Sequence, residues 1–528
     1  MGSLSDLKLR IASASGSATD RRFGFADLAK TEDVGYIVRD WMSEYNMTTR
    51  GGAKVNSSGA SDEFEDSFLE AILPALPHLA ARHIKVAVNA GASDTEKLHD
   101  ILVDKIKDAG LDLKVAWVGG DEVMDLVESA AKEGNELKSL TTVYHFGWER
   151  GNLEQLAHAL VAGHFIECST YVTGGNFSGF KSLPGNSTNL GFPIVEMGQN
   201  GEFDVTMQKD RDGMVTVDTC KAQLLYEIQG PLYYNSDVVA VLGNIKIEQR
   251  AENRVWVDCH LQQGPQLILC SHVSNVGYLK PPPTTKVGIT ASGGFQAEAH
   301  YFLCGLDMEE KARLLENQIR AALGQKKYHC LKFRTNGRCP VDPKSQDAAT
   351  VDFRILAQAK NEEDLVTAKF LRPITDTIMQ SYPGATFAVD ARQAAPRPYY
   401  EYWVSLLSQS NVKHVCHIPA ENLDIPIAPP TDTQDFLHSQ STYETANPRD
   451  LSTFGPTERV PLGYVVHARS GDKGSDCNVG FFVRNADEYE WFQSILTIDK
   501  IRQLLNEDDT GKPIFRFELA NIWGRQLL

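Results

Sequence analysis

The sequence has little that would suit a membrane or a secretory route. Its most apolar early run, residues 68–81, is short and contains Pro74 and Pro77, whereas a membrane-spanning helix needs about 20 apolar residues in a row. The first residues, MGSLSDLKLR, lack the basic and then apolar layout of a secretory signal. We therefore expect a cytoplasmic protein with no membrane partner.

Cysteine is sparse and the usual metal motifs are missing. There are nine cysteines, an odd number at wide spacing, and none lies in a CxxC pair. That usage is typical of reduced thiols in the cytosol and speaks against a disulfide framework or a zinc site. HExxH, GxSxG and EF-hand patterns are also absent. We therefore expect no bound metal.

The chain is short of positive charge. Its formal net charge of −17 disfavours nucleic acid and anionic lipid as partners, because both would be repelled. A small anionic metabolite is still a suitable ligand, because helix N-termini and a few Arg or Lys can capture it locally.

Apolar strands alternate with helical segments in the first third of the chain. Strands are expected at 9–14, 84–89, 113–118 and 165–168, with helices at 95–109, 122–133 and 152–162 between them. Such alternation predicts an α/β fold, a doubly wound and mostly parallel sheet with helices on both faces.

Later segments predict further parts of the molecule. From about residue 200, short strands such as 215–219 and 255–259, with helices at 308–323 and 362–382, indicate an α+β second layer. Residues 425–460 are rich in Pro, Thr, Ser and Asp and read as a linker. The expected domains are therefore 1–424 and 461–528, joined by 425–460. A homo-oligomer is expected by analogy with other parallel-sheet proteins.

Two glycine-containing stretches are candidate ligand sites. In the first, Gly16, Ser17 and Arg21 follow the first strand, where small residues let backbone N–H groups approach an anion; a plain tight turn explains the pattern equally well. In the second, Glu167 and the glycine-rich run 174–176 follow an expected strand. Strand ends of open α/β sheets are where ligands bind. Gly174, Gly175 and Asn176 are therefore binding candidates, and Glu167 is a candidate base.

Two single acids are weaker candidates. Glu196 ends an apolar run and either faces a pocket, as a base, or lies on a solvated edge. Asp237 follows Tyr-Tyr-Asn-Ser and is either a ligand group or the cap of a proline turn.

The segment ARSGDKGSDCNVG, from Ala468 to Gly480, is the richest in chemistry. Arg469 and Lys473 suit a carboxylate or phosphate. Asp472 could orient them or act as a base. Ser470 and Asn478 are further substrate-binding candidates. A simple charged turn would rarely need so many glycines.

Four segments together resemble the acyclic terpene utilisation (AtuA-like) family: GHFIECSTYVTGGNF, GFPIVEM, YEIQGPLYYNSDVV and ARSGDKGSDCNVG. The resemblance spans nearly the whole chain and implies a main domain followed by a small ferredoxin-like C-terminal domain. It also implies a role in the breakdown of branched terpenoid acids as coenzyme A thioesters, next to biotin-dependent carboxylases. A lyase or hydration reaction would suit that setting. The residues that the resemblance implies for the site are Gly174, Gly175, Asn176, Glu196, Asp237, Arg469, Asp472 and Lys473.

Three functions stay open on these grounds. The first is a lyase or hydro-lyase acting on a small carboxylic acid or its thioester, with no cofactor beyond coenzyme A as part of the substrate. The second is a hydrolase or an ester-transferring cyclase with Cys168 or Ser470 as nucleophile. The third is a non-catalytic partner of an acyl-CoA carboxylase.

Overall fold

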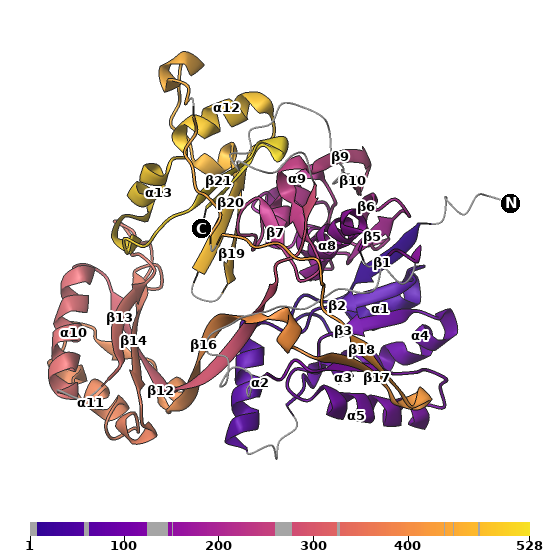
Figure 1. Ribbon diagram of the computed structural model, residues 1–528. Helices are drawn as coiled ribbons and strands as arrows, with labels where there is room; N and C mark the ends of the chain where they lie inside the picture. Colours follow the sequence, from indigo (N-terminus) through magenta and orange to yellow (C-terminus); the bar gives the residue numbers. More distant parts are fainter. Residues whose placement is uncertain are drawn as a thin grey trace. The chain divides into compact units, whose positions relative to one another are not determined.

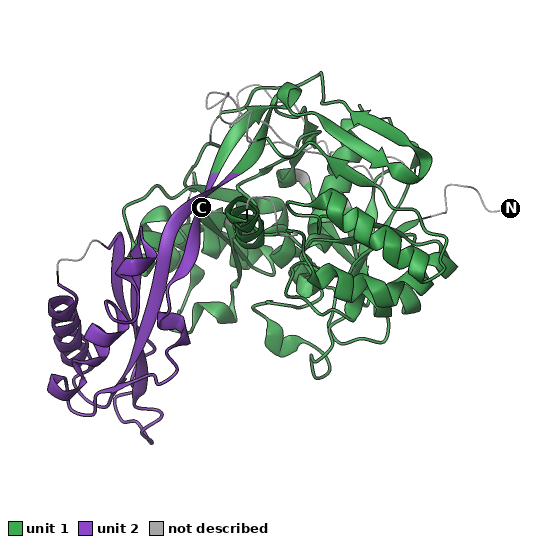
Figure 2. Cartoon of the chain, turned by 90° about the horizontal axis from the view of Figure 1, so that it is seen from below, with its two compact units in different colours: residues 1–288, 404–528 green, residues 289–403 purple. Residues whose placement is uncertain are grey.

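The chain divides into two compact units (Figure 2). The computed structural model describes residues 8–57, 63–123, 146–149, 151–258, 277–324, 328–437, 439–446, 448–473 and 476–527, without the side chains of Asn244 and Lys473. Unit 1 comprises residues 1–288 and 404–528, and unit 2 is residues 289–403. Unit 2 is thus an insertion in the sequence of unit 1.

A seven-stranded sheet organises unit 1, in the order β3-β2-β1-β5-β6-β10-β9 (Figure 1). Its strands are β1 (Leu9–Ser13), β2 (Tyr36–Arg39), β3 (Lys85–Val88), β5 (Pro193–Met197), β6 (Phe203–Met207), β9 (Lys246–Ala251) and β10 (Arg254–Asp258). Pairing is parallel among β1, β2 and β3 and antiparallel for the rest. The predicted α/β class is confirmed, but the sheet is mixed and not mostly parallel.

Helices cover both faces of this sheet, because its strands alternate apolar residues between two cores. Ile11 packs into one core with Phe165, and the next residue, Ala12, packs into the other with Phe25. The helices of the two layers are α1 (Gly24–Thr31), α2 (Glu44–Asn56), α3 (Ser67–Ile72), α4 (Leu76–Arg82), α5 (Thr95–Asp108), α8 (Leu153–Glu167) and α9 (Val217–Leu224). No helix in the described part of the chain has the length and apolar character of a membrane span.

Smaller sheets complete the chain. Two three-stranded sheets of unit 1 are β11 (Tyr278–Leu279), β8 (Val239–Val241), β7 (Leu232–Tyr234), and β18 (Leu423–Ile427), β17 (His414–Ile418), β4 (Trp117–Gly119). Unit 2 is built from β12 (Thr284–Cys304), β13 (Cys330–Asn336), β14 (Thr350–Ala359), β15 (Thr386–Phe387), β16 (Arg397–Ser408), α10 (Met308–Leu323) and α11 (Leu371–Thr375). The C-terminal sheet has the order β19-β20-β22-β21, from β19 (His467–Lys473), β20 (Asp476–Phe482), β21 (Arg516–Leu519) and β22 (Gly524–Leu527), with α12 (Ala486–Ile495) and α13 (Ile498–Leu505) beside it.

Several expected elements are wrong in type. The expected strand 165–168 is the last turn of α8, and the expected strand 215–219 is the start of α9, where Thr216 and Thr219 form a capping box. Short apolar runs do not distinguish strand from buried helix. Of the expected helix 362–382, only the short α11 and two 3-10 turns form, and Pro373 lies within α11. The expected helix 122–133 lies mostly outside the described residues.

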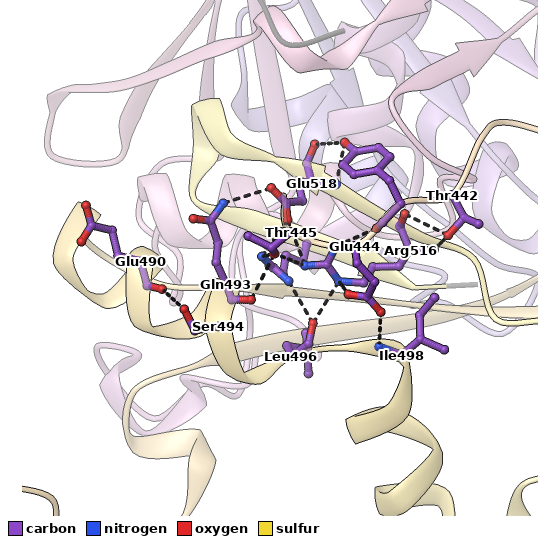
Figure 3. A network of polar contacts seen from close by, with 12 residues as sticks. Thr442, Glu444, Thr445, Glu490, Gln493, Ser494, Leu496, Ile498, Arg516 and Glu518 are labelled. Atoms are coloured by element: carbon purple, nitrogen blue, oxygen red, sulfur yellow. Dashed lines mark hydrogen bonds and ion pairs between the residues drawn. The ribbon is translucent and has the colours of Figure 1, made fainter. Parts of the chain in front are cut away.

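The expected linker is fastened to the C-terminal sheet by a buried polar network (Figure 3). Arg516 and Arg525 are fully buried, and each donates to Glu518 Oε1, at 2.9 and 2.8 Å. Both also donate to Thr445 Oγ1 and to the Leu496 carbonyl. Residues 442–445 therefore pack as a strap along β21.

Candidate functional site

The segment expected to be a charged loop is a β-hairpin. β19 and β20 pair residue by residue from His467 with Phe482 to Lys473 with Asp476. Strand alternation buries Arg469 at 8% exposure and leaves Ser470 and Asp472 exposed. Lys473 ends β19, and its side chain is not among those described. Among the expected cations and bases of this segment whose side chains are described, Arg469 is thus the one that is buried.

Arg469 packs against two tyrosine rings that meet edge to face, with their centres 5.4 Å apart. Its guanidinium carbon is 4.0 Å from the centre of the Tyr171 ring and 4.2 Å from that of Tyr226. Its Nη1 donates to the carbonyl of Asn176 at 3.2 Å, and its buried Nε has no hydrogen-bond partner in the described part of the chain. Cation–π contacts of this kind are worth up to about 2 kcal/mol where water is excluded. The C-terminal hairpin and the glycine-rich turn therefore meet at one charged group.

Two further residues of the hairpin pack against the segment that follows α9. A Cβ added to Gly471 would lie 2.5 Å from Glu227 Cγ, so no larger residue fits there without a shift. The buried Asn478 accepts from the Glu227 backbone N–H at 3.1 Å and donates to the Leu225 carbonyl at 2.8 Å. Asn478 thus acts on the backbone next to Tyr226.

Three non-glycine residues around Arg469 have left-handed backbones. Ser169, Asn176 and Glu227 have φ of 53°, 53° and 58°. For an L-residue other than glycine this region costs about 1–2 kcal/mol, and such strain tends to gather at ligand sites. The turns that surround Arg469 are therefore maintained against a local energetic preference.

Glu167 and His164 form a pair at the end of α8, next to this cluster. His164 is 3% exposed, its Nδ1 lies 2.7 Å from Glu167 Oε1, and its Nε2 is 2.9 Å from the Gln223 carbonyl. Burial alone would lower the pKa of His164. The charge of Glu167, the hydrogen bonds with Glu167 and with the Gln223 carbonyl, and the charge of Glu227 together raise it above its ordinary value. His164 thus contacts a carboxylate whose side chain is about one-third exposed.

The two glycine turns differ in how they relate to Arg469. Gly174 and Gly175 belong to the compact turn that ends at Asn176, where Gly175 N–H donates to the Thr170 carbonyl at 2.8 Å. A Cβ on Gly16 would lie 2.6 Å from the Cα of Cys168, so the first turn passes directly against the end of α8.

The remaining residues of the first turn have structural partners. Arg21 donates to Asn189 Oδ1 at 2.5 Å and to the Leu190 carbonyl at 2.8 Å, and Ser17 is exposed. These contacts tie the first turn to the segment before β5. Among the described contacts, none joins Arg21 or Ser17 to Arg469.

Another buried arginine is the last residue of the parallel strand β2. Arg39 is 4% exposed, stacks 4.2 Å from the Trp41 ring centre, and within the described ranges has no hydrogen-bond partner on any guanidinium nitrogen. Burial lowers its pKa to about 9. No sequence motif singled it out.

Glu196 and Asp237 lie in other surroundings. Glu196 projects from β5 into ion pairs with Arg254 at 2.6 Å and Arg10 at 3.1 Å. Burial would raise the pKa of Glu196, but the hydrogen bond and charge of Arg254 lower it below its usual range. A carboxylate held in this way is a poor base. Asp237 lies in the turn between β7 and β8.

The residues that sequence reasoning missed are Tyr171, Tyr226, Glu227 and Arg39. The two tyrosines follow the ends of α8 and α9, and no spacing in the sequence links them to Arg469. Burial raises the pKa of Tyr226, and its hydrogen bond with Glu227 adds to that rise. Both phenols contact Arg469 only because the fold brings three distant segments together.

Comparison with known proteins gives two family matches. Residues 9–143 and 140–418 match the acyclic terpene utilisation family protein AtuA, and residues 460–521 match the AtuA ferredoxin-like domain. No curated protein and no solved structure matches the chain.

Proposed function

The chain belongs to the acyclic terpene utilisation family, and from that premise we propose that it is an enzyme acting on a small carboxylic acid or its thioester by acid and base chemistry. Family membership supports a role in acyclic terpene utilisation. The reaction that we propose is of the lyase or hydro-lyase type, in which a base removes a proton beside a carbonyl and a cation stabilises the anion that forms.

The observation that supports this proposal most is the surroundings of Arg469. A guanidinium that is 8% exposed and covered by two phenol rings has lost most of its water. Among the described contacts, the hydrogen bond of this guanidinium goes from Nη1 to the carbonyl of Asn176, which is a neutral acceptor. In a site with little water, a carboxylate or enolate is bound far more strongly than at the surface. Arg469 is therefore the proposed anchor for the anionic group.

Glu167 is the proposed base, and His164 is the group that positions it. The 2.7 Å contact with His164 fixes the orientation of the carboxylate, while its partial exposure leaves it reachable by a substrate. Tyr226, whose single O–H is engaged by Glu227, is proposed as a wall of the site beside Arg469 and not as a donor to the oxyanion. Asp472 is exposed and Glu196 is ion-paired elsewhere, so neither is retained as a base.

A nucleophilic mechanism has less support. Cys168 is the C-cap of α8, and the negative end of a helix dipole disfavours a thiolate there. Ser470 is exposed on the outer face of the hairpin. We therefore do not retain these two residues as nucleophiles.

Turnover of a panel of branched short-chain acids and their coenzyme A thioesters, followed by mass spectrometry of the products, tests the proposal. Arg469→Met should lower kcat/KM by about 100-fold or more, and Glu167→Gln should lower kcat by a similar factor. Arg338→Met, an exposed arginine of unit 2, is the matched control and should leave turnover unchanged.

Two outcomes would overturn the assignment. Unchanged turnover in a folded Arg469→Met variant would remove the proposed anchor. No turnover of any panel member by the unaltered protein, together with co-purification of a biotinylated carboxylase, would replace the enzyme with an assembly partner.

A further inference from the structure

A groove of about 850 Å³ opens at the N-terminal end of α9, within unit 1. Its walls are the first turns of α9, the strand β9, Arg484 after β20, and the turn from Asn521 to Trp523. α9 has eight residues, so at 1.5 Å per residue its two ends lie roughly 12 Å apart. Tyr226 and Arg469 are at the other end of the helix, so the groove is a separate site.

Positive charge is in excess inside this groove. Its lining holds three cations, Lys221, Lys246 and Arg484, against two carboxylates, Asp218 and Glu248. The lining residues thus carry one more positive than negative charge, whereas the whole chain has a net charge of −17, and the charge of Glu488 also acts on Lys221. Lys246 has no ion pair with any residue in the described ranges.

Lys221 is a buried cation whose capacity to donate is only partly used. The residue is 3% exposed, and its ammonium group donates to the Val483 carbonyl at 3.2 Å. It also lies 4.5 Å from the centre of the Trp523 ring. An ammonium group has three donors, and burial lowers its pKa from the ordinary value. A nearby anion would relieve that cost.

The rest of the lining is apolar. Val217, Ile247, Ile522 and the indole of Trp523 face the same groove. Pockets that combine apolar walls with a few fixed polar groups bind small amphipathic ligands, and 300–1,000 Å³ is the usual range of their volume.

We propose that this groove binds a monoanionic carboxylate with an apolar body, the carboxylate toward Lys221 and Lys246 and the body against Ile247, Ile522 and Trp523. The charge balance decides among anions. Coenzyme A and nucleoside triphosphates have three or four negative charges, which one surplus positive charge does not neutralise. A single carboxylate matches it. This site does not depend on the proposed function at Arg469.

Titration calorimetry with octanoate tests the proposal on the full-length protein. Octanoate should bind saturably at one site. Acetate lacks the apolar chain and 1-octanol lacks the negative charge, so each should bind at least ten-fold more weakly. Lys246→Gln removes a half-buried charge and should weaken octanoate about five-fold. Trp523→Phe should abolish the change in tryptophan fluorescence on binding.

Matched variants keep the test independent of folding and of the other site. Lys209→Gln, an exposed lysine outside the groove, should bind octanoate as the unaltered protein does, and so should Arg469→Met. Equal affinity of the Lys246→Gln variant would overturn the proposal. So would acetate or octanol binding as tightly as octanoate, or coenzyme A competing at lower concentration than octanoate. Loss of binding in Arg469→Met alone would place octanoate at the other site and also overturn it.

Discussion

Replacing Glu518 by glutamine tests how the C-terminal sheet holds two buried guanidinium groups. Glu518 Oε1 accepts from both Arg516 and Arg525, and its side chain is 15% exposed, so water screens these contacts little. A charge-assisted hydrogen bond is worth about 1.5–3 kcal/mol, and a neutral one about half as much. Two bonds weakened by half therefore cost about 1.5–3 kcal/mol, at or below the lower end of about 3–5 for breaking a buried pair.

Urea unfolding followed by tryptophan fluorescence and circular dichroism gives the measurement. Glu490→Gln is the matched control, because its ion pair with Arg449 joins side chains that are 55% and 54% exposed. Exposed pairs of this kind contribute about 0–1 kcal/mol. We expect the midpoint to fall clearly for Glu518→Gln and hardly at all for the control. Equal losses in the two variants, or a loss under about 1 kcal/mol for Glu518→Gln, would refute the reasoning.

Three further predictions concern stability. Because the pKa of His164 is raised in the folded state, its stabilising contribution is complete below its ordinary pKa and is lost as the pH rises through the folded-state value. In urea titrations the advantage over His164→Gln should therefore shrink as the pH rises above about 6.5, and an advantage that does not change with pH would contradict it. Arg39→Met should raise stability by about 1–2 kcal/mol, since it removes a buried cation whose three nitrogens have no hydrogen-bond partner among the described residues, at the loss of cation–π contacts with Trp41 and Phe25; a lower unfolding midpoint would count against this balance. Gly480→Ala places a Cβ 2.3 Å from Leu225 Cβ and should cost about 1–3 kcal/mol, whereas Gly463→Ala, with nothing within 4 Å, should unfold at nearly the midpoint of the unaltered protein.

Local patterns predicted those elements whose apolar residues also have clear boundaries. β1 and β3 are short apolar runs that end at small-residue turns, and α5 ends at Gly110 as expected. The end of α8 was misread because its apolar run continues through Gly163 without a break, and a Cβ at that glycine would meet nothing within 4 Å. A glycine was taken as a boundary where the helix simply tolerates it.

The candidate site could be predicted only in its separate pieces. Arg469 and Asn176 were chosen because their residue types suit anions, and the structure joins them through one hydrogen bond. The tyrosine rings that desolvate Arg469 come from two other helix ends, and the spacing of these residues in the sequence does not predict that they come together. Glu196 was chosen for the same kind of reason, but an acid on a strand can equally face cations on neighbouring strands, here Arg10 and Arg254.

The order of the C-terminal sheet makes the final strand an interior one, since β22 lies between β20 and β21. A stop codon after Ile522 would leave two strands without their shared neighbour and Glu518 without one of its two arginines. Termination there should therefore behave as a folding defect of the C-terminal sheet.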